Sequence, residues 1–317
     1  MKRPLILDAE QLSVGPRSWL AQRAEVVSVG PEAGDRWTAM LSKAAGLVVR
    51  TYTRVDAALL ALAPNLRVVG RAGVGLDSID VAACRARGIE VVYTPDANAS
   101  TVAELVFGLL LDVLRPRPRL TRELTTEEWA VARHEHLGER ELAGMTLGIW
   151  GLGRVGSKVA RVGRGFAMRV LYHDLRAIPE AERGGAEAVD RDSLLSQADV
   201  LSVHVDGRAE NRGLITTSTF EAMKPDAVFV NAARGFVVDP LAARAWLDGN
   251  PGARAICDVH EPEPLPSDHP LLGHPRALLT PHLGAGTSPA KDRMGRVVED
   301  VWRVLCEEPP RWPAPRR

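Results

Sequence analysis

Four polar side chains that follow predicted strands in the second half of the chain have the chemistry of an acid–base site. They are Arg234, Asp258, Glu263 and His282. A guanidinium keeps its charge and pairs with a carboxylate through two hydrogen bonds, and a histidine, with an ordinary pKa of about 6.5, exchanges protons near neutral pH. Open α/β sheets bind ligands beyond the carboxyl ends of their strands, so we expect these side chains to converge. Taken singly, each also fits a plainer interpretation as a solvated charge or a turn residue.

A glycine-rich turn lies between two predicted strands upstream of these residues. Gly151, Gly153 and Gly156 form G-x-G-x-x-G, and Asp174 comes 23 residues after the first glycine, close to the spacing of about 20 expected for a ribose-binding carboxylate. The glycines permit the tight turn, the approach of a pyrophosphate and close helix packing, respectively. Because Asp174 would repel a 2′-phosphate, we interpret the turn as an NAD site. NADP is less favoured, although Arg176 leaves that preference open.

The elements that must position these residues are short apolar runs that alternate with helical stretches. Runs this apolar are buried on both faces, which indicates parallel sheets covered by helices. One set precedes a long helical stretch at 101–114, and the other follows it. The runs are 5–8, 25–29, 46–50, 66–70 and 90–94, then 146–150, 169–174, 198–205, 227–233, 253–259 and 277–282. We predict two doubly wound α/β domains, a final amphipathic helix over 293–305, and poor order in the Pro-rich segment 307–317.

Composition and charge exclude several classes of protein. The 317 residues are 45% apolar and contain 40 basic and 40 acidic side chains. This balance suits two globular domains and argues against binding nucleic acid or an anionic membrane by bulk electrostatics. The apolar stretch at 105–111 is far too short to cross a bilayer, and Asp8 interrupts the run near the start. Cys84, Cys257 and Cys306 form no metal-type cluster. We expect a cytoplasmic protein with no metal, nucleic-acid partner or membrane contact.

Several long segments, in this order, resemble the D-isomer-specific 2-hydroxyacid dehydrogenase family over nearly the whole chain. Besides the glycine-rich turn, they are VGRAGVGLDSIDVAACRARGIEV (69–91), NASTVAEL (98–105), MKPDAVFVNAARG (223–235) and TPHLGAGT (280–287). The chain looks most like phosphoglycerate dehydrogenase-like members without a regulatory domain, so we expect no feedback through such a domain. The resemblance implies NAD-dependent interconversion of a small D-2-hydroxy acid and its 2-keto acid.

The resemblance implies that the catalytic residues are Arg234, Glu263 and His282. Arg234 would bind the substrate carboxylate and polarise the C2 oxygen. His282 would take the hydroxyl proton as hydride leaves C2, or return it during reduction. Glu263 would hydrogen-bond the imidazole ring and orient it.

Cofactor and substrate contacts are implied in the same way. The cofactor contacts are Gly151, Gly153, Arg154, Val155, Gly156, Asp174, His204, Ala232, Asp258 and Gly284, with a structural role also open for His204. The substrate contacts are Arg50, Arg71, Val74, Gly75 and Asn98, of which Val74 and Gly75 would offer backbone N–H groups to the substrate carboxylate. Arg50, Arg54 and Arg71 align with basic positions that phosphoglycerate dehydrogenases use around the substrate phosphate, and solvated charge explains Arg54 about as well.

Some positions depart from the family pattern. Asp206 replaces a proline that usually lines the adenosine pocket, and His260 stands where an aromatic residue is usual. The stretch 129–144 is longer than expected for a phosphoglycerate dehydrogenase and often borders the partner's active site in the family. We expect the substrate to be 3-phosphoglycerate or a related acid such as glycerate, with hydroxypyruvate as its keto form.

The expected fold is a Rossmann NAD-binding domain (98–285) inserted into a flavodoxin-like substrate domain (1–97 and 286–317). By resemblance the protein should be a homodimer joined through the cofactor domains. An alternative is an NAD(H)-binding regulatory protein resembling the transcriptional corepressors that share this fold. Such a regulator would bind NADH yet turn over negligibly with every keto acid.

Overall fold

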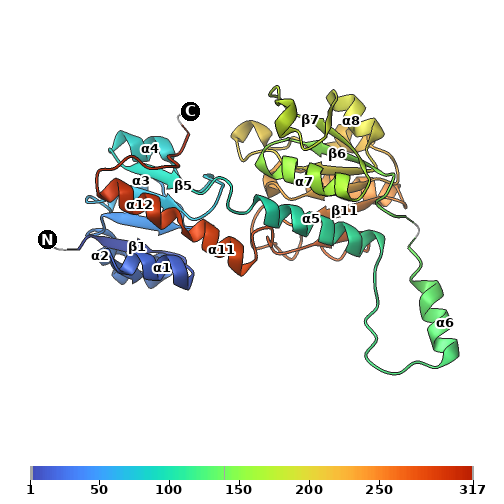
Figure 1. The fold of residues 1–317 in the computed structure, drawn as a ribbon, viewed down its shortest axis with the longest axis horizontal. Coiled ribbons are helices and arrows are strands. Elements are labelled where there is room, and N and C mark those ends of the chain that lie inside the picture. The colour runs from blue at the N-terminus through green and yellow to red at the C-terminus, as the bar shows by residue number, and fades with distance from the viewer. Residues whose placement is uncertain (1–2, 139, 316–317) are drawn as a thin grey trace. The chain divides into compact units, whose positions relative to one another are not determined.

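The structure, a computed structural model, describes residues 3–138 and 140–315 and divides into two compact units (Figure 1). One unit contains residues 3–98 and 285–315, and the other contains 99–284. Each unit is built on one sheet in which every pair of neighbouring strands is parallel, five-stranded in the first and seven-stranded in the second. The predicted α/β architecture is therefore confirmed.

The first unit has the strand order β2-β1-β3-β4-β5, which is the flavodoxin-like order. Its strands are β1 (Leu5–Asp8), β2 (Glu25–Ser28), β3 (Gly46–Val49), β4 (Val68–Arg71) and β5 (Glu90–Tyr93). Its helices are α1 (Val14–Ala21), α2 (Asp35–Leu41), α3 (Ala57–Ala61), α4 (Val81–Ala86), α11 (Ser288–Gly295) and α12 (Val297–Leu305), with the 3-10 turn η1 (Pro31–Ala33). Successive strand residues such as Ile6 and Leu7 enter separate apolar clusters, because side chains alternate between the two faces of the sheet.

The second unit has the order β12-β11-β10-β9-β6-β7-β8, a Rossmann order extended by a seventh strand. Its strands are β6 (Thr146–Trp150), β7 (Arg169–His173), β8 (Glu187–Ala188), β9 (Val200–Val203), β10 (Val228–Asn231), β11 (Arg254–Cys257) and β12 (Ala277–Leu279). Its helices are α5 (Ala99–Leu114), α6 (Thr126–Glu135), α7 (Arg154–Gly165), α8 (Arg191–Gln197), α9 (Thr217–Glu221) and α10 (Pro240–Gly249), with 3-10 turns η2 (Glu180–Glu182), η3 (Ala209–Asn211) and η4 (Gly235–Val237).

One expectation for the end of the chain is confirmed in part, and another is wrong. The final amphipathic helix is α12, which begins at Val297, whereas Ser288–Gly295 form a separate helix, α11; the two meet at Arg296. Gly295 packs closely on α1, since an added Cβ would lie 2.7 Å from Pro16. The Pro-rich segment is ordered through residue 315 because it adds to the first unit. The Asp300 carboxylate accepts the N–H groups of Arg311 and Trp312 at 3.0 and 2.8 Å, and Ala314 is buried.

The segment between α5 and β6 leaves the body of the second unit and carries α6 apart from the sheet (Figure 1). A capping box at Thr125 and Glu128 begins α6, yet none of its described residues is buried. Apolar side chains on the segment are exposed, namely Leu120, Trp129, Val131 and Leu137. Such a short helix is marginal without packing, so the segment is a candidate for contact with another chain.

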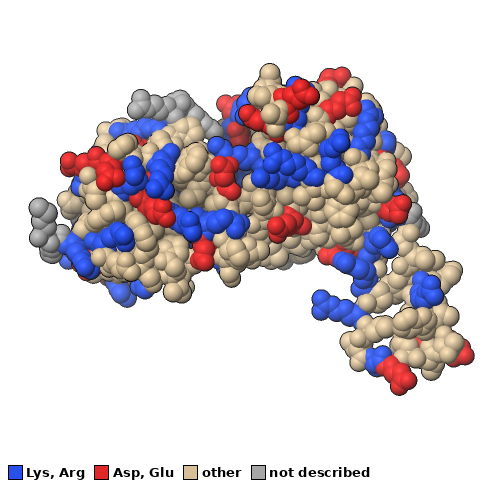
Figure 2. All heavy atoms as spheres, viewed as in Figure 1, with Lys and Arg blue, Asp and Glu red and all other residues tan. Residues whose placement is uncertain are grey.

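Surface charge and helix length place simple bounds on partners. Figure 2 shows both signs of charge across the viewed face, with basic side chains gathered over α7. None of the helices in residues 3–138 and 140–315 combines the length and apolar character that crossing a bilayer requires. Within those same ranges, no group of three or more His, Cys, Asp or Glu side chains is arranged to hold a metal ion.

Candidate active site

The glycine-rich turn joins β6 to α7 and has the shape that a dinucleotide requires. Gly151 has φ +95°, and a Cβ added there would lie 2.9 Å from the backbone of His204. A Cβ on Gly156 would collide with the carbonyl of Gly151, whereas one on Gly153 would point into open space. No side chain caps α7, so its first N–H groups remain for an anion. The open space above Gly153 and the uncapped helix fit the pyrophosphate of NAD.

Asp174 lies just past β7, beside this turn. Its carboxylate accepts the N–H of Leu152 at 2.8 Å and pairs with the side chain of Arg176 at 3.2 Å. Burial raises the pKa of Asp174, but hydrogen bonds from Arg176 and Leu152 outweigh that effect and hold the pKa below its ordinary value. The carboxylate is therefore charged at neutral pH, as an acceptor for ribose hydroxyls must be.

A second acid–arginine pair stands past β9, the strand on the other side of β6. Asp206, which departs from the family pattern, accepts two hydrogen bonds from Arg208 at 2.7 and 2.6 Å and one from Asn211 at 3.0 Å. The charge of Asp174 also acts on Arg208, so the two pairs are electrostatic neighbours. A charged pair therefore stands beside Asp174, at the position where family resemblance leads us to expect a proline.

His204 is buried beneath the turn rather than exposed at its edge. Its Nε2 lies 2.8 Å from Ser202 Oγ, and its Nδ1 has no hydrogen-bond partner among the described residues. Burial lowers the pKa of His204 to about 4, so the ring is neutral near pH 7. A neutral, enclosed ring next to Gly151 supports a structural role.

Glu263 and His282 form the clearest catalytic geometry. Glu263 follows β11 and His282 follows β12, and these neighbouring strands bring Oε2 within 2.8 Å of His282 Nδ1. The other oxygen of Glu263 accepts the N–H of His260 at 3.0 Å. Burial raises the pKa of Glu263, but the bonds from His282 and His260 prevail and lower it. An ionised carboxylate on Nδ1 fixes the tautomer of the ring and leaves Nε2 for proton exchange.

Asp258 holds the loop that carries His282. Its carboxylate is buried and accepts Thr280 Oγ1 at 2.6 Å and the N–H groups of Leu283 and Gly284 at 2.7 Å each. Its backbone carbonyl accepts the N–H of His282 at 2.8 Å. His282 has φ +54°, a conformation that a non-glycine residue keeps only when its surroundings impose it. Sequence analysis assigned Asp258 to the cofactor, and this anchoring contact was missed.

Arg234 lies three residues past the end of β10, at the same edge of the sheet, and its Nη1 donates to the carbonyl of Ala233 at 2.7 Å. The Asn231 side chain accepts the N–H of Ala233 at 3.1 Å and donates to the carbonyl of Arg234 at 2.9 Å, which fixes the turn between them. Gly235 packs so closely on His260 that a side chain there would collide with the His260 backbone. The turn of Arg234 and the loop of Glu263 are therefore in direct contact. Ala232, predicted to touch the cofactor, lies in this turn.

In the first unit, the predicted substrate residues lie at the carboxyl edge of the sheet. Arg71 ends β4 and donates to the carbonyls of Gly75 at 2.8 Å and Ala72 at 3.1 Å, so its side chain shapes the loop that contains Val74. Arg50 directly follows β3. Asn98 ends the first part of the unit and has a buried Oδ1 without a hydrogen-bond partner in the part of the chain described.

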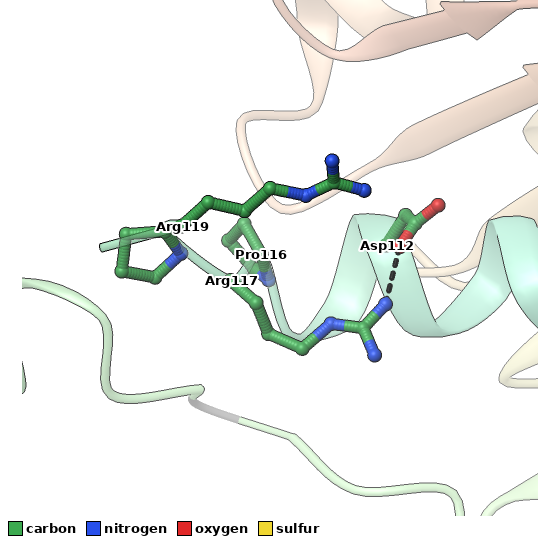
Figure 3. Close-up of a pocket in the computed structure, with 5 residues that line it drawn as sticks. Asp112, Pro116, Arg117 and Arg119 are labelled. Atoms are coloured by element: carbon green, nitrogen blue, oxygen red, sulfur yellow. Dashed lines mark hydrogen bonds and ion pairs between the residues drawn. The ribbon is translucent and has the colours of Figure 1, made fainter. Parts of the chain in front are cut away.

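One hollow on the second unit lies away from these residues. It is drawn in Figure 3 and is lined by Asp112, Pro116, Arg117, Pro118 and Arg119, at the end of α5 where the extended segment begins. Arg117 pairs with Asp112 at 2.5 Å. None of the predicted site residues lines this hollow. The candidate site is therefore defined by strand ends and hydrogen bonds and lies apart from this hollow.

Comparison with known proteins shows which family the chain resembles. Residues 107–284 match the model of the D-isomer specific 2-hydroxyacid dehydrogenase, NAD binding domain. The chain is 38% identical over 310 residues to a D-3-phosphoglycerate dehydrogenase of Mycobacterium bovis, covering 97% of the chain but only 58% of that relative. It is 37% identical over 263 residues to a hydroxypyruvate reductase of Thermotoga maritima, covering 82% of the chain and 84% of the relative. Among solved structures, the TT0316 protein from Thermus thermophilus is 33% identical with a TM-score of 0.85, covering 98% of this chain and 100% of that one.

Proposed function

Because this chain belongs to the D-isomer specific 2-hydroxyacid dehydrogenase family, we propose that it interconverts a small D-2-hydroxy acid and its 2-keto acid with NAD(H). The observation that carries the proposal is the 2.8 Å contact between Glu263 Oε2 and His282 Nδ1. It lies at the carboxyl edge of the same sheet as the glycine-rich turn, where ligands of such sheets bind.

The proton chemistry follows from the orientation of this pair. In oxidation, His282 takes the proton of the C2 hydroxyl at Nε2, and in reduction it returns a proton to the C2 oxygen. The Glu263 carboxylate keeps the Nδ1–H in place and stabilises the imidazolium that forms. Arg234 binds the substrate carboxylate and polarises the C2 oxygen. Bound NAD supplies the hydride acceptor, and NADH the hydride donor.

We assign cofactor binding to the turn and the strand ends around it. The backbone of Gly153, Arg154 and Val155 at the start of α7 would receive the pyrophosphate. Asp174 would accept hydrogen bonds from the adenosine ribose, and its charge favours NAD over NADP. In the first unit, family resemblance assigns the substrate to the N–H groups of Val74 and Gly75 and to Arg50, Arg71 and Asn98.

The names of the relatives point to three-carbon acids. D-3-phosphoglycerate dehydrogenases and a hydroxypyruvate reductase both match the chain at similar identity. We therefore propose glycerate and hydroxypyruvate, or 3-phosphoglycerate and its keto acid, as the substrate class. These pairs share the C1 carboxylate and the C2 carbon and differ only in the group on C3.

The test is to mix the protein with NADH and a panel of 2-keto acids and to follow nicotinamide absorbance. Hydroxypyruvate, 3-phosphohydroxypyruvate, glyoxylate and pyruvate form the panel. His282→Ala should lower kcat by about 10²-fold or more, because it removes the acid–base group, while NADH still binds in a fluorescence titration. Bound NADH with no turnover of any acid by the wild-type protein would refute the enzyme and favour the regulatory alternative.

We also infer that the protein forms a homodimer through the extended segment around α6. The segment exposes Leu120, Trp129, Val131 and Leu137, and α6 buries none of its described residues. A second copy of the same segment offers the matching apolar surface in a symmetric contact. Light scattering should give twice the 34.3 kDa mass of one chain; the mass of a single chain would refute the inference.

A further inference from the structure

The segment that follows β9 carries a charged cluster close to the glycine-rich turn. Asp206 accepts hydrogen bonds from Nε and Nη2 of Arg208 at 2.7 and 2.6 Å, each on a different carboxylate oxygen. This two-bond geometry is the one in which an arginine binds a carboxylate most firmly. The Asn211 side chain, which is buried, donates to Asp206 Oδ1 at 3.0 Å and to the Asp206 carbonyl at 2.9 Å. A buried amide therefore holds the acid in place, and the acid holds the guanidinium.

The cluster stands beside the strand end to which the cofactor is assigned. The turn follows β6, and the neighbours of β6 in the sheet are β7 on one side and β9 on the other. A Cβ added to Gly151 would lie 2.9 Å from the backbone N of Val205, and Asp206 is the next residue. On the other side, Asp174 accepts a backbone N–H of the turn at 2.8 Å. The two acids therefore flank the strand end beyond which an adenosine ribose would lie.

Each of these two acids holds one arginine. Asp174 pairs with Arg176 at 3.2 Å, and Asp206 pairs with Arg208 at 2.6 Å. The Arg176 and Arg208 side chains are 63% and 40% exposed, so each guanidinium has room to move once its acid is removed. A guanidinium binds phosphate through the same two-bond geometry with which it binds a carboxylate. Either arginine would therefore bind the 2′-phosphate of NADP if its acid were absent.

We propose that Asp206 is a second determinant of cofactor specificity, acting beside Asp174. By keeping Arg208 in an ion pair, Asp206 withholds the guanidinium from a 2′-phosphate, and the enzyme favours NAD over NADP. The inference rests on the proposed dehydrogenase function. It assigns this role to a position where family resemblance leads us to expect a proline, whose side chain has no acceptor for an arginine.

The balance of charge around Arg208 supports this assignment. Besides Asp206, the charges of Glu210 and Asp174 act on Arg208, so three acids and the two arginines at 176 and 208 leave an excess of negative charge. A 2′-phosphate would bring about two further negative charges, and close like charges are unfavourable. The adenosine ribose of NAD carries neutral hydroxyl groups there, which the Asp174 carboxylate can accept as hydrogen-bond donors.

The experiment titrates NADH and NADPH against wild type and variants, with nicotinamide fluorescence giving both Kd values. Asp206→Ala should lower the ratio of the NADPH Kd to the NADH Kd by about fivefold, the upper range for a charge pair that water partly screens. Asp206→Asn, which keeps the side-chain shape and an acceptor for Asn211, should shift the ratio in the same direction. Arg208→Ala leaves the Asp206 charge unpaired and should raise the ratio. The double variant Asp206→Ala/Arg208→Ala has the net charge of wild type and should have its ratio.

Glu187→Ala is the matched control, because it breaks another exposed ion pair of the same unit. Glu187 pairs with Arg169 at 3.2 Å, and Arg169 begins β7, about 16 Å along the strand from Asp174. This exceeds the screening length of about 8 Å at physiological salt, so the control should keep the wild-type ratio. A ratio that neither Asp206 variant lowers would overturn the proposal. An equal decrease in Asp206→Ala and in the double variant would also overturn it, because Arg208 would then play no part.

A fragment of the cofactor separates this inference from the proposed function. Adenosine 2′,5′-bisphosphate carries only the adenosine end, so its binding requires neither the nicotinamide nor a substrate. Compared with AMP, it should raise the Tm of Asp206→Ala more than that of wild type, because a ligand that binds the native state stabilises it. A wild type that binds NADH but turns over no keto acid would refute the enzyme. The fragment titration would still decide the role of Asp206, since equal stabilisation of the two proteins refutes it.

Discussion

Replacing Asp258 by Ala should release the loop that carries His282. Asp258 is 2% exposed, and its carboxylate accepts Thr280 Oγ1 and the N–H groups of Leu283 and Gly284 at 2.6, 2.7 and 2.7 Å. All three donors lie within the loop, on either side of the histidine. Loss of the Asp258 carboxylate therefore affects both ends of the turn that orients the imidazole ring of His282.

The magnitude follows from what each donor can do without Asp258. The Gly284 N–H is in a buried bond, so it is left without a partner at a cost of about 1–3 kcal/mol. Leu283 is 45% exposed and Thr280 has a rotatable hydroxyl, so water can replace part of their bonds. The strain of His282 at φ +54° is stored in the folded state, so its relief when the loop moves offsets the loss by about 1 kcal/mol. We expect the free energy of unfolding to fall by about 2 kcal/mol.

The assay pairs urea denaturation with turnover and NADH binding. Asp258→Asn keeps the side-chain volume but loses one hydrogen-bond acceptor and the charge, so its free energy of unfolding should also be lower than that of wild type. In both variants kcat should fall, because His282 leaves its position on Glu263. Asp268→Asn, an exposed carboxylate in the same loop region, is the control and should resemble wild type. If both Asp258 variants unfold within about 0.5 kcal/mol of wild type, the usual range for surface changes, and keep its kcat, the anchoring role is refuted.

Two further predictions concern the nucleotide side of the second unit. Burial lowers the pKa of His204 to about 4 from 6.5. Between these two pH values the unfolded state binds a proton that the folded state does not, so protonation favours unfolding. The free energy of unfolding should therefore be unaffected by His204 above pH 6.5 and fall by about 3 kcal/mol as the pH drops to 4. His204→Gln should flatten this decrease in urea titrations across pH, and an unchanged slope would assign it to another group. Asp174→Ala should lower the ratio of the NADPH Kd to the NADH Kd by about tenfold or more, since it removes the repelling carboxylate and releases Arg176 to bind phosphate. Nicotinamide fluorescence measures both constants, and an unchanged ratio would place selectivity elsewhere.

The sequence predicted the strand interiors well because β-branched apolar runs are buried on both faces of a parallel sheet. It predicted strand ends less well. The run 198–205 was expected to be a strand to its end, but β9 stops at Val203, and the run 277–282 contains β12 only as far as Leu279. Apolar and β-branched patterning continues into residues that have already turned away from the ladder. The chemistry begins where the ladder ends, so the least predictable positions are those that surround the site.

Contacts between residues far apart in the chain were beyond reach for a different reason. The hydrogen bonds between the Glu10 carboxylate and the backbone N–H groups of residues 50–53 cross 40 to 43 residues, and no local pattern near Glu10 distinguishes it from a solvated acid. The Pro-rich segment was expected to lack order because its composition suits a free tail, yet its residues bond to Asp300 and to β5. In both cases the partner exists only once the sheet has formed. The Glu263–His282 pair was reached through family resemblance, which supplies such long-range contacts indirectly.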